Sequence, residues 1–187
     1  MTFQGRWSAA ICTCALLVML WSSAAGLKDG GAVVTVAPEI LYAPEDKPAD
    51  RLVALYKGAR HEILIATYGL TYPPVVKALV AAKKRGVDVR IITDRGKLDD
   101  RNQRSALETL RLAGVPIKVN RHDGLMHMKQ VVVDDLVNTS GSMNQTSSAA
   151  LYNDERLDIL HDPTSTQRAK DKFLRMWADH ARYEDWR

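Results

Sequence analysis

The sequence predicts an α/β fold in which helices cover both faces of a mixed β-sheet. Short β-branched, apolar segments alternate with amphipathic helical segments, as in β-α units whose strands run parallel. Later, two apolar runs flank an Asp134-Asp135 pair, which predicts an antiparallel hairpin in the same sheet. The 187 residues suffice for one well-buried domain and are too few for two of ordinary size, so we expect a single domain.

The chain begins with a segment that has the three parts of a secretory signal peptide. Arg6 supplies a positive charge, Ile11 to Trp21 is apolar but short for a membrane span, and Ser23-Ala24-Ala25 offers small residues for cleavage. We therefore expect residues 1–25 to be a signal peptide and residues 26–187 to form the mature domain. The protein would be periplasmic or secreted, or else anchored in a membrane by an uncleaved leader.

Composition argues against thiol chemistry in the mature domain. Both cysteines, Cys12 and Cys14, lie in the predicted leader, so we expect neither a disulfide nor a Cys-ligated metal after it. The formal net charge of +4 is compatible with a polyanionic partner but does not by itself indicate one.

The first half of the domain is predicted to contain three strands and two helices. Ala32 to Ala37 is β-branched and predicts a strand, and Pro48 to Arg60 has the apolar spacing of a helix. His61 to Leu70 predicts a buried strand. Val75 to Arg85 predicts a helix that is ended by the glycine after it. Val87 to Asp94 alternates apolar and polar residues and predicts the next strand.

The middle of the chain is predicted to continue this alternation and then to form the hairpin. Asp99 to Ala113 has leucines at helical spacing and predicts a helix, and Pro116 to Arg121 predicts a strand. Met128 to Asp134 and Leu136 to Ser140 are the two hairpin strands.

The last part is predicted to add two helices and a strand. Asn144 to Tyr152 predicts a short helix, Arg156 to His161 an edge strand, and Thr164 to Arg182 a closing helix. In the closing helix, Phe173 and Trp177 recur at helical spacing, which favours packing against the core over contact with a bilayer.

The chemically distinctive residues are concentrated around the hairpin. In a strand, His127 and Lys129 point to the same face because side chains alternate. Gly141 allows a close turn at the end of the second strand, and Ser142 and Asn144 are expected to open the next helix, whose free N–H groups favour anions. A histidine, a lysine, an amide and a hydroxyl therefore converge on a group the size of phosphate.

Two carboxylates accompany this set. Glu155 follows the short helix, where it can return to orient a histidine ring nitrogen. Asp134 is interpreted mainly as a turn residue. Each residue has an ordinary structural explanation when it is taken alone, as a strand histidine, a surface lysine, a helix cap or a strand-edge acid. The joint spacing favours a phosphate site over the coincidence of all these explanations.

The spacing resembles the signature of the phospholipase D superfamily, which in this chain reads His127-x-Lys129-x4-Asp134-x6-Gly141-Ser142-x-Asn144. The likeness continues to Glu155 and extends upstream over Lys77 to Gly96 and Leu110 to Val119, so that it covers essentially Pro38 to Trp177. In size, leader and single motif, the chain is most similar to the small bacterial periplasmic endonucleases of that superfamily.

Two positions depart from the pattern of the superfamily. Gln145 stands where an aromatic residue is common, which would alter the wall of the site. Arg156 stands where asparagine is frequent. Neither departure removes a group with a chemical role.

The resemblance implies a phospholipase D-like fold and a metal-independent phosphodiesterase. His127 would attack phosphorus to form a phosphohistidine, and a second histidine would protonate the leaving oxygen and then activate water. Lys129 and Asn144, aided by Ser142, would hold the non-bridging oxygens, and Glu155 would set a histidine tautomer in its own or a partner subunit. No cofactor is implied, and the sequence has no His pair or carboxylate cluster at metal-ligand spacing.

The motif occurs once, although this chemistry uses two histidines. The other histidines of the domain lack a lysine two positions later: His61, His122, His161 and His180. A twofold homodimer would place His127 beside its symmetry mate and make one composite site from two chains. The alternative is that His122, in a predicted turn, serves as the acid within one chain.

The motif does not separate a nuclease from a phospholipase, because both cleave phosphodiesters. Basic residues at helix and strand ends are expected to form a rim that tracks a nucleic-acid backbone: Arg85, Arg95, Lys97, Arg101, Arg104 and Arg121. Arg95 and Arg121 are the candidates for substrate binding. We therefore favour a non-specific endonuclease that cleaves DNA, with RNA as a second substrate. The alternatives are a phospholipase D-type hydrolase of phospholipids and an inactive, dimeric nucleic-acid-binding protein.

Overall fold

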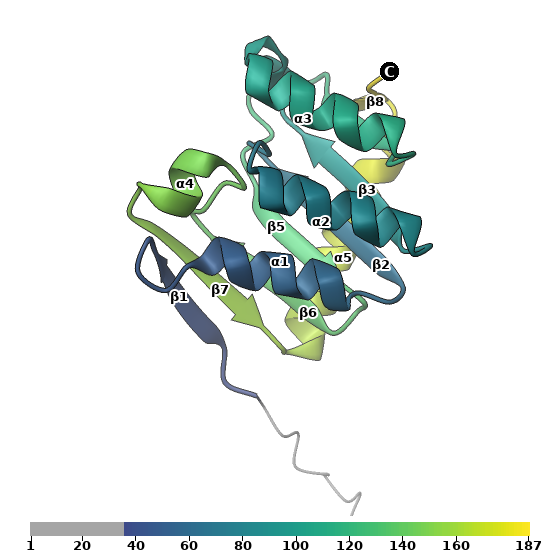
Figure 1. Cartoon of the computed structure of the whole chain (residues 1–187). Helices are drawn as coiled ribbons and strands as arrows, with labels where there is room; N and C mark the ends of the chain where they lie inside the picture. Colours follow the sequence, from purple (N-terminus) through teal and green to yellow (C-terminus); the bar gives the residue numbers. More distant parts are fainter. Residues whose placement is uncertain (1–35) are drawn as a thin grey trace, which may run out of the picture. The chain divides into compact units, whose positions relative to one another are not determined.

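The computed structural model describes residues 36–187. The predicted signal peptide and most of the strand predicted at 32–37 lie outside these residues. One eight-stranded mixed sheet, with the order β1-β7-β6-β5-β2-β3-β4-β8, forms the centre of the described part (Figure 1). The strands are β1 (Glu39–Ala43), β2 (Glu62–Thr67), β3 (Asp88–Thr93), β4 (Ile117–Asn120), β5 (Lys129–Val133), β6 (Val137–Gly141), β7 (Glu155–Leu160) and β8 (Tyr183–Asp185).

Helices cover both faces of the sheet, as predicted. The helices are α1 (Pro48–Gly58), α2 (Pro73–Lys84), the 3-10 helix η1 (Arg95–Asp99), α3 (Arg101–Leu112), α4 (Ser147–Leu151) and α5 (Pro163–Ala178). Helices α1, α2 and α3 pack on one face through buried residues such as Leu52, Leu79 and Leu107. Helix α5 packs on the other face, where Phe173 lies in one cluster with Leu64. None of the helices within residues 36–187 has the length and apolar character needed to cross a bilayer.

The first half of the sheet is built from parallel strands joined by helices. Strand β2 pairs with β3, and β3 pairs with β4, in parallel register. The residues that end α2 and α3 include Gly86 and Gly114, whose φ angles are 91° and 82°. Glycine adopts these left-handed values without the steric cost that a side chain brings, so both helices stop where the sequence predicts.

The second half of the sheet is antiparallel. Strand β5 lies antiparallel to β2 and forms the predicted hairpin with β6. The turn residues Asp134 and Asp135 both have left-handed conformations, with φ angles of 53° and 58°, and the N–H of Leu136 closes the turn by donating to the Val133 carbonyl at 3.0 Å. Strands β7 and β1 continue the sheet beyond β6.

The margins of the sheet differ from the sequence-based predictions. The first strand begins at Glu39, and the described residues of the segment 32–37 are not in a strand. The strand predicted as an edge, β7, lies between β6 and β1. The closing helix ends at Ala178 instead of Arg182, and the chain after it adds β8 to β4. Strands β1 and β8 are short and partly exposed, so they lack the buried apolar pattern by which a strand is recognised.

Candidate active site

Apart from Asp134, the motif residues meet at one end of the sheet, which we call the site end. Strands β2, β3, β4 and β6 finish there, and β5 and β7 begin there, as the pairs Thr67–Lys129 and Gly141–Leu157 show. The topology therefore brings together residues that lie far apart in the sequence. The same topology leaves the two hairpin turn residues, Asp134 and Asp135, at the opposite end.

His127 and Lys129 are in direct contact. His127 precedes β5 instead of lying within it, and Lys129 is the first residue of the strand. The Lys129 Nζ lies 3.0 Å from Nδ1 and 3.1 Å from Nε2 of His127, and it donates to the His127 carbonyl oxygen at 2.9 Å. The two ring nitrogens direct their bonds apart, so at most one of the ring contacts is a hydrogen bond. The lysine thus stands directly beside the imidazole.

The environment of Lys129 makes its ammonium group easier to deprotonate. Partial burial lowers the pKa of Lys129 below its usual value, and the negative charge of Glu155 opposes this shift. Burial acts in this direction because a charged ammonium loses hydration that a neutral amine does not need. The site therefore contains a partly desolvated cation.

Tyr68 is a site residue that the sequence reasoning missed. Its ring centroid lies 4.7 Å from that of His127, and the two rings are inclined by 59°. Two ammonium groups face the same ring, Lys97 at 4.8 Å and Lys129 at 5.4 Å from its centroid. Ring contacts of this kind orient an imidazole, and cations are attracted to an aromatic face. The available signal was an aromatic residue directly after the buried run of β2.

Gly141 is required by a close passage of two backbones. Its φ is 138°, and a Cβ atom built on it would lie 2.1 Å from the carbonyl oxygen of Arg156. That same oxygen accepts hydrogen bonds from the backbone N–H of Ser142 at 3.0 Å and of Met143 at 3.4 Å. The glycine therefore lets the chain after β6 bond to the start of β7.

Ser142 and Glu155 interact with each other across this passage. The Ser142 hydroxyl donates to the Glu155 carboxylate and accepts from the backbone N–H of Arg156 at 3.1 Å. The other Glu155 oxygen accepts from Asn153 at 3.2 Å. Within one chain Glu155 is hydrogen-bonded to these two side chains, and His127 is not among its partners. The expectation that Glu155 orients a histidine is therefore not met by a contact inside the chain.

Asn144 lies at the site, but it does not open a helix. The predicted helix 144–152 is shorter than expected: α4 begins at Ser147, and Thr146 caps it. A five-residue helix that starts three residues later does not offer its N–H groups beside Ser142, so the predicted helix-end anion site is wrong. The Oδ1 atom of Asn144 is buried without a hydrogen-bond partner among the described residues. Its amide therefore has bonding capacity to spare.

Gln145 supports the site from the inside instead of forming its wall. It is buried, and it accepts a hydrogen bond from the hydroxyl of Tyr56 at 3.0 Å. Its backbone N–H donates to Gly69 at 2.9 Å, and its carbonyl accepts from Thr71 and Tyr72 at 2.9 Å. These backbone hydrogen bonds tie the segment of Asn144 to the loop that carries Tyr68. The prediction that Gln145 alters the wall of the site is not supported.

A second set of buried polar residues holds the segment that leads into His127. The Asp94 carboxylate, 1% exposed, accepts from the N–H of Met126 at 2.6 Å and of Gly96 at 2.9 Å. Asn120 accepts from the N–H of Arg95 at 2.8 Å and donates to the Gly124 carbonyl at 3.0 Å. These bonds fix the position of His127 by fixing the backbone before it.

Asp134 is structural, as its turn position suggested. Its carboxylate accepts three backbone hydrogen bonds, from Arg60 at 2.8 Å, His61 at 2.8 Å and Glu62 at 2.9 Å. Burial raises the pKa of Asp134, but these three donors outweigh burial, so the pKa lies below its usual value. The residue locks the hairpin turn to the start of β2, at the end of the sheet away from His127.

Only part of the predicted basic rim lies at the site end of the sheet. Arg95 and Arg121 are exposed and follow β3 and β4 at the site end, although Arg121 also lies 3.6 Å from Glu184. Arg85 belongs elsewhere, because it ends α2 at the opposite end and donates to the carbonyl oxygens of Tyr56 and Ala59.

His122 makes its ring contacts away from His127. Its Nδ1 lies 2.7 Å from the Asp123 carbonyl oxygen, and its ring meets Tyr183 edge-on at 5.5 Å. No group of three or more potential metal ligands occurs within residues 36–187.

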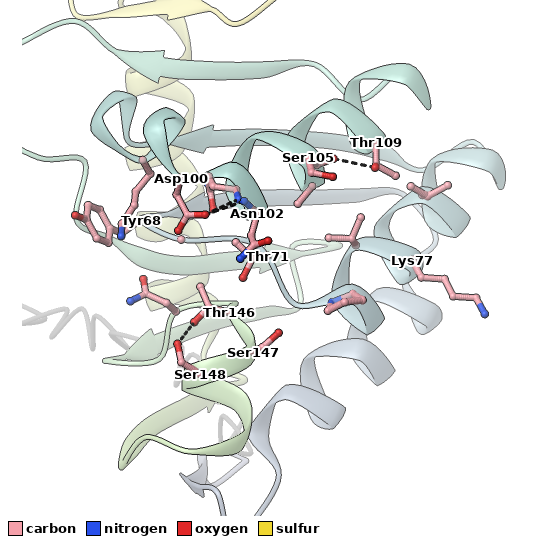
Figure 2. A pocket seen from close by; sticks show the side chains of 18 residues that line it. Tyr68, Thr71, Lys77, Asp100, Asn102, Ser105, Thr109, Thr146, Ser147 and Ser148 are labelled. Carbon is pink, nitrogen blue, oxygen red and sulfur yellow. Dashed lines mark hydrogen bonds between the residues drawn. The ribbon is translucent and has the colours of Figure 1, made fainter.

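Two hollows flank the site. One, of about 500 Å³, is lined by His127, Lys129 and residues of β6 and α5. The other, of about 920 Å³, runs between α2, α3 and α4, and we call it the α2–α3–α4 groove. Figure 2 shows Tyr68 at one end of this groove and Lys77 at the other. Asn144 lines the groove, and Tyr68 connects it to His127.

Comparison with known proteins gives relatives for most of the domain. The family model described as cardiolipin synthase, PLD-like domain, matches residues 52–177. A mitochondrial cardiolipin hydrolase of Xenopus tropicalis is 30% identical over 135 residues, which are 72% of this chain and 63% of that protein. A phospholipase D of Rickettsia conorii is 30% identical over 119 residues, which are 64% of this chain and 56% of that protein.

One solved structure is similar to this chain over nearly the whole length of the solved protein. Nuc, a phospholipase D family member from Salmonella typhimurium, aligns with a TM-score of 0.75 and 28% sequence identity, over 81% of this chain and 98% of that one. This chain thus spans less than two thirds of the two sequence relatives and nearly all of the structural one.

Proposed function

Since this chain belongs to the phospholipase D superfamily, we propose that it is a phosphodiesterase, and foremost a non-specific endonuclease that cleaves DNA. RNA is the second nucleic-acid substrate. The observation that carries the proposal is the meeting of His127, Lys129 and Asn144 at the site end of the sheet. Phosphoryl transfer needs a nucleophile to attack phosphorus, and a cation and an amide donor to stabilise the negative charge on the phosphate oxygens.

The proposed reaction has two displacements at phosphorus. In the first, a nitrogen of His127 forms a bond to phosphorus while the bond from phosphorus to the leaving oxygen breaks, and a second histidine gives that oxygen its proton. In the second, this histidine takes a proton from water, whose oxygen replaces the His127 nitrogen on phosphorus. The products are a phosphomonoester and an alcohol, and both histidines return to their starting state.

Lys129 and Asn144 would bind the non-bridging oxygens of the phosphate. Lys129 is partly desolvated, and a desolvated cation stabilises developing negative charge more strongly than a hydrated one. Asn144 contributes its amide group, whose N–H donors would bind a phosphate oxygen, whereas its Oδ1, unpartnered among residues 36–187, is an acceptor and would not. Ser142 would act through its bond with Glu155 and would keep that carboxylate in place.

The second histidine would come from a second copy of the chain. A twofold homodimer would place His127 of the partner subunit opposite the first and form one composite site. Two observations favour this arrangement over an acid within one chain: His127 is exposed, and His122 makes its ring contacts elsewhere. Glu155 would then act on the imidazole of the partner subunit.

The signal peptide and the periplasmic or secreted location remain part of the proposal. They rest on residues 1–25, which lie outside the described residues. Comparison of the amino-terminal sequence of protein from the cell envelope with that of the full chain tests them. An intact leader on membrane-bound protein would instead support the anchored alternative.

A phospholipase activity is the competing candidate, and the names of the relatives favour it. Both sequence relatives are named for the hydrolysis of phospholipids. The decisive assay offers plasmid DNA, RNA and phosphatidylglycerol vesicles to the purified protein in excess EDTA. We expect nucleic-acid cleavage that His127→Ala abolishes and that Lys57→Gln, an exposed change on α1, leaves intact.

Each other result of this assay has a definite meaning. Hydrolysis of the lipid alone would replace the nuclease with a phospholipase. Cleavage that requires a divalent metal would contradict the metal-independent mechanism. Binding of nucleic acid without turnover of any substrate would favour the inactive binding protein.

A further inference from the structure

The α2–α3–α4 groove has a lining in which hydroxyl-bearing residues lie beside apolar ones such as Val76, Val80 and Ala106. Six of its residues carry aliphatic hydroxyl groups: Thr71, Ser105, Thr109, Thr146, Ser147 and Ser148. Several of them are labelled in Figure 2, where they lie along the groove between Tyr68 and Lys77. An acyl chain laid along these hydroxyls would remove them from water without offering a hydrogen bond in return, which is unfavourable.

The charge of the groove suits a polyanion. Lys77 and Lys97 lie in its lining, and neither forms an ion pair within residues 36–187. The acidic residue of the lining, Asp100, is already engaged, because its carboxylate accepts from the N–H of Asn102 at 2.8 Å and of Gln103 at 3.2 Å. The groove therefore offers a ligand two cations and the hydroxyls of Thr71, Ser105 and Ser147. The Thr109 hydroxyl already donates to the Ser105 carbonyl, and those of Thr146 and Ser148 lie 3.2 Å from each other.

The groove is also continuous with the candidate site. Asn144 belongs to its lining and to the motif, and the ring of Tyr68 faces the groove and contacts His127. The ammonium of Lys97 lies over that ring, at 4.8 Å from its centroid. A chain of phosphates that has one member at His127 can therefore pass Tyr68 and Lys97 into the groove.

We propose that the α2–α3–α4 groove binds the single-stranded nucleic acid on one side of the scissile phosphate. Lys97 binds the phosphate nearest to the reaction, Lys77 binds a more distant one, and the hydroxyls bond to sugar and phosphate oxygens. The small apolar patch of Pro73, Val76 and Val80 receives a base or a sugar face. Positively charged grooves with an aromatic residue are a general means of binding single strands. The inference rests on the proposed nuclease function, since it names where this nuclease would bind the strand beside the scissile phosphate.

Binding to an inactive protein tests the groove separately from catalysis. The His127→Ala protein is titrated into a fluorescein-labelled 12-nucleotide oligothymidylate, and the dissociation constant is measured by anisotropy over a range of salt concentrations. Adding Lys77→Gln or Lys97→Gln should weaken binding and reduce the slope of log Kd against log salt by about 0.7 for each lysine removed. Lys57→Gln, which removes an exposed lysine from α1 outside the groove, should leave the slope unchanged.

A groove-filling variant gives an independent result. Ser105→Trp places a large side chain in the groove, and Ala54→Trp places the same side chain on the exposed face of α1. We expect only Ser105→Trp to weaken oligothymidylate binding, by about tenfold or more.

These experiments distinguish a failure of the groove proposal from a failure of the proposed nuclease function. If the groove variants and the control variants change the dissociation constant for oligothymidylate equally, the groove proposal is overturned, even if the wild-type protein cleaves DNA. Groove variants that lose binding to phosphatidylglycerol vesicles but retain oligothymidylate would overturn it in favour of a lipid. A wild-type protein that hydrolyses no phosphodiester in EDTA would defeat the proposed function. The anisotropy titration would still show whether the groove binds single-stranded nucleic acid.

Discussion

At the scale of single residues, the fold depends on close backbone contacts that leave no room for a side chain and on carboxylates that accept hydrogen bonds from backbone N–H groups. Gly141 and Asp134 are the two clearest cases. Gly141 lies against the carbonyl of Arg156, and Asp134 anchors the hairpin turn to β2. Neither residue contacts His127, so their roles can be tested through stability.

Gly141→Ala should destabilise the fold severely. The added Cβ would lie 2.1 Å from the Arg156 oxygen, at a φ of 138° that residues with side chains rarely adopt. We expect a loss of about 2 kcal/mol or more in the free energy of unfolding, measured by urea denaturation. Gly58→Ala is the matched control, because nothing lies within 4 Å of its Cβ position at the end of α1. That change should be neutral or stabilising by about 0.5 kcal/mol. Similar values for both variants would contradict the close passage.

Asp134 should contribute stability that depends on pH. Its pKa in the folded state lies below the usual value of 3.8. A lowered carboxyl pKa stabilises the fold above the unfolded pKa, and this contribution is lost as the pH falls through the folded value. Asp134→Asn keeps a residue type that tolerates the left-handed turn but removes the charge. The melting temperature of the variant should lie below that of the wild type at pH 7, and the difference should shrink below about pH 4. A difference that is constant with pH would contradict the role of the charge.

At the scale of elements, the central strands and main helices were predictable, and the margins were not. The segments that became β2 to β6 and α1 to α3 have buried, periodic patterns, because each of them packs in the interior. Strands β1 and β8 take the two edges and lack such patterns. Helix α4 was placed too early because Ser142 and Asn144 resemble helix caps, although Thr146 makes the cap.

The same contrast applies to the residues of the site. His127, Lys129, Gly141 and Asn144 were found because the motif spacing is local in the sequence. Tyr68 was missed because it comes from the end of β2, and only the pairing of β2 with β5 brings it to His127. Contacts of this type depend on strand order, which no local pattern encodes.

Gln103 connects three elements and should be sensitive to a change that preserves its volume. It is 1% exposed, accepts from the Leu70 N–H at 2.7 Å and donates to the Thr93 hydroxyl at 3.1 Å. Gln103→Met would leave both groups buried without their partner, at a cost of about 2 kcal/mol in the free energy of unfolding. The control Gln167→Met loses only an exposed bond to Asp171 and should cost little. If the two variants unfold at the same urea concentration, Gln103 does not brace the loop of Tyr68.

At the scale of the whole molecule, the single motif makes the assembly part of the chemistry. A site that takes one histidine from each of two chains fails when either chain lacks it. Wild-type and His127→Ala proteins mixed in equal amounts, unfolded and refolded together, would form dimers at random. We expect about one quarter of the wild-type activity per total protein if the site is shared, and about one half if each chain works alone. Size-exclusion chromatography with light scattering checks that the mixture is dimeric, and a value near one half would contradict the composite site.

The central claim is that His127 attacks phosphorus. Its most direct test is to mix the protein in excess EDTA with an oligonucleotide that carries ³²P at its internal phosphates, and to quench the reaction within milliseconds. We predict a label on the protein that survives base, is lost in acid, maps to His127 and is absent from His127→Ala. Cleavage by the wild type without any such label, or a label on another residue, would contradict the account.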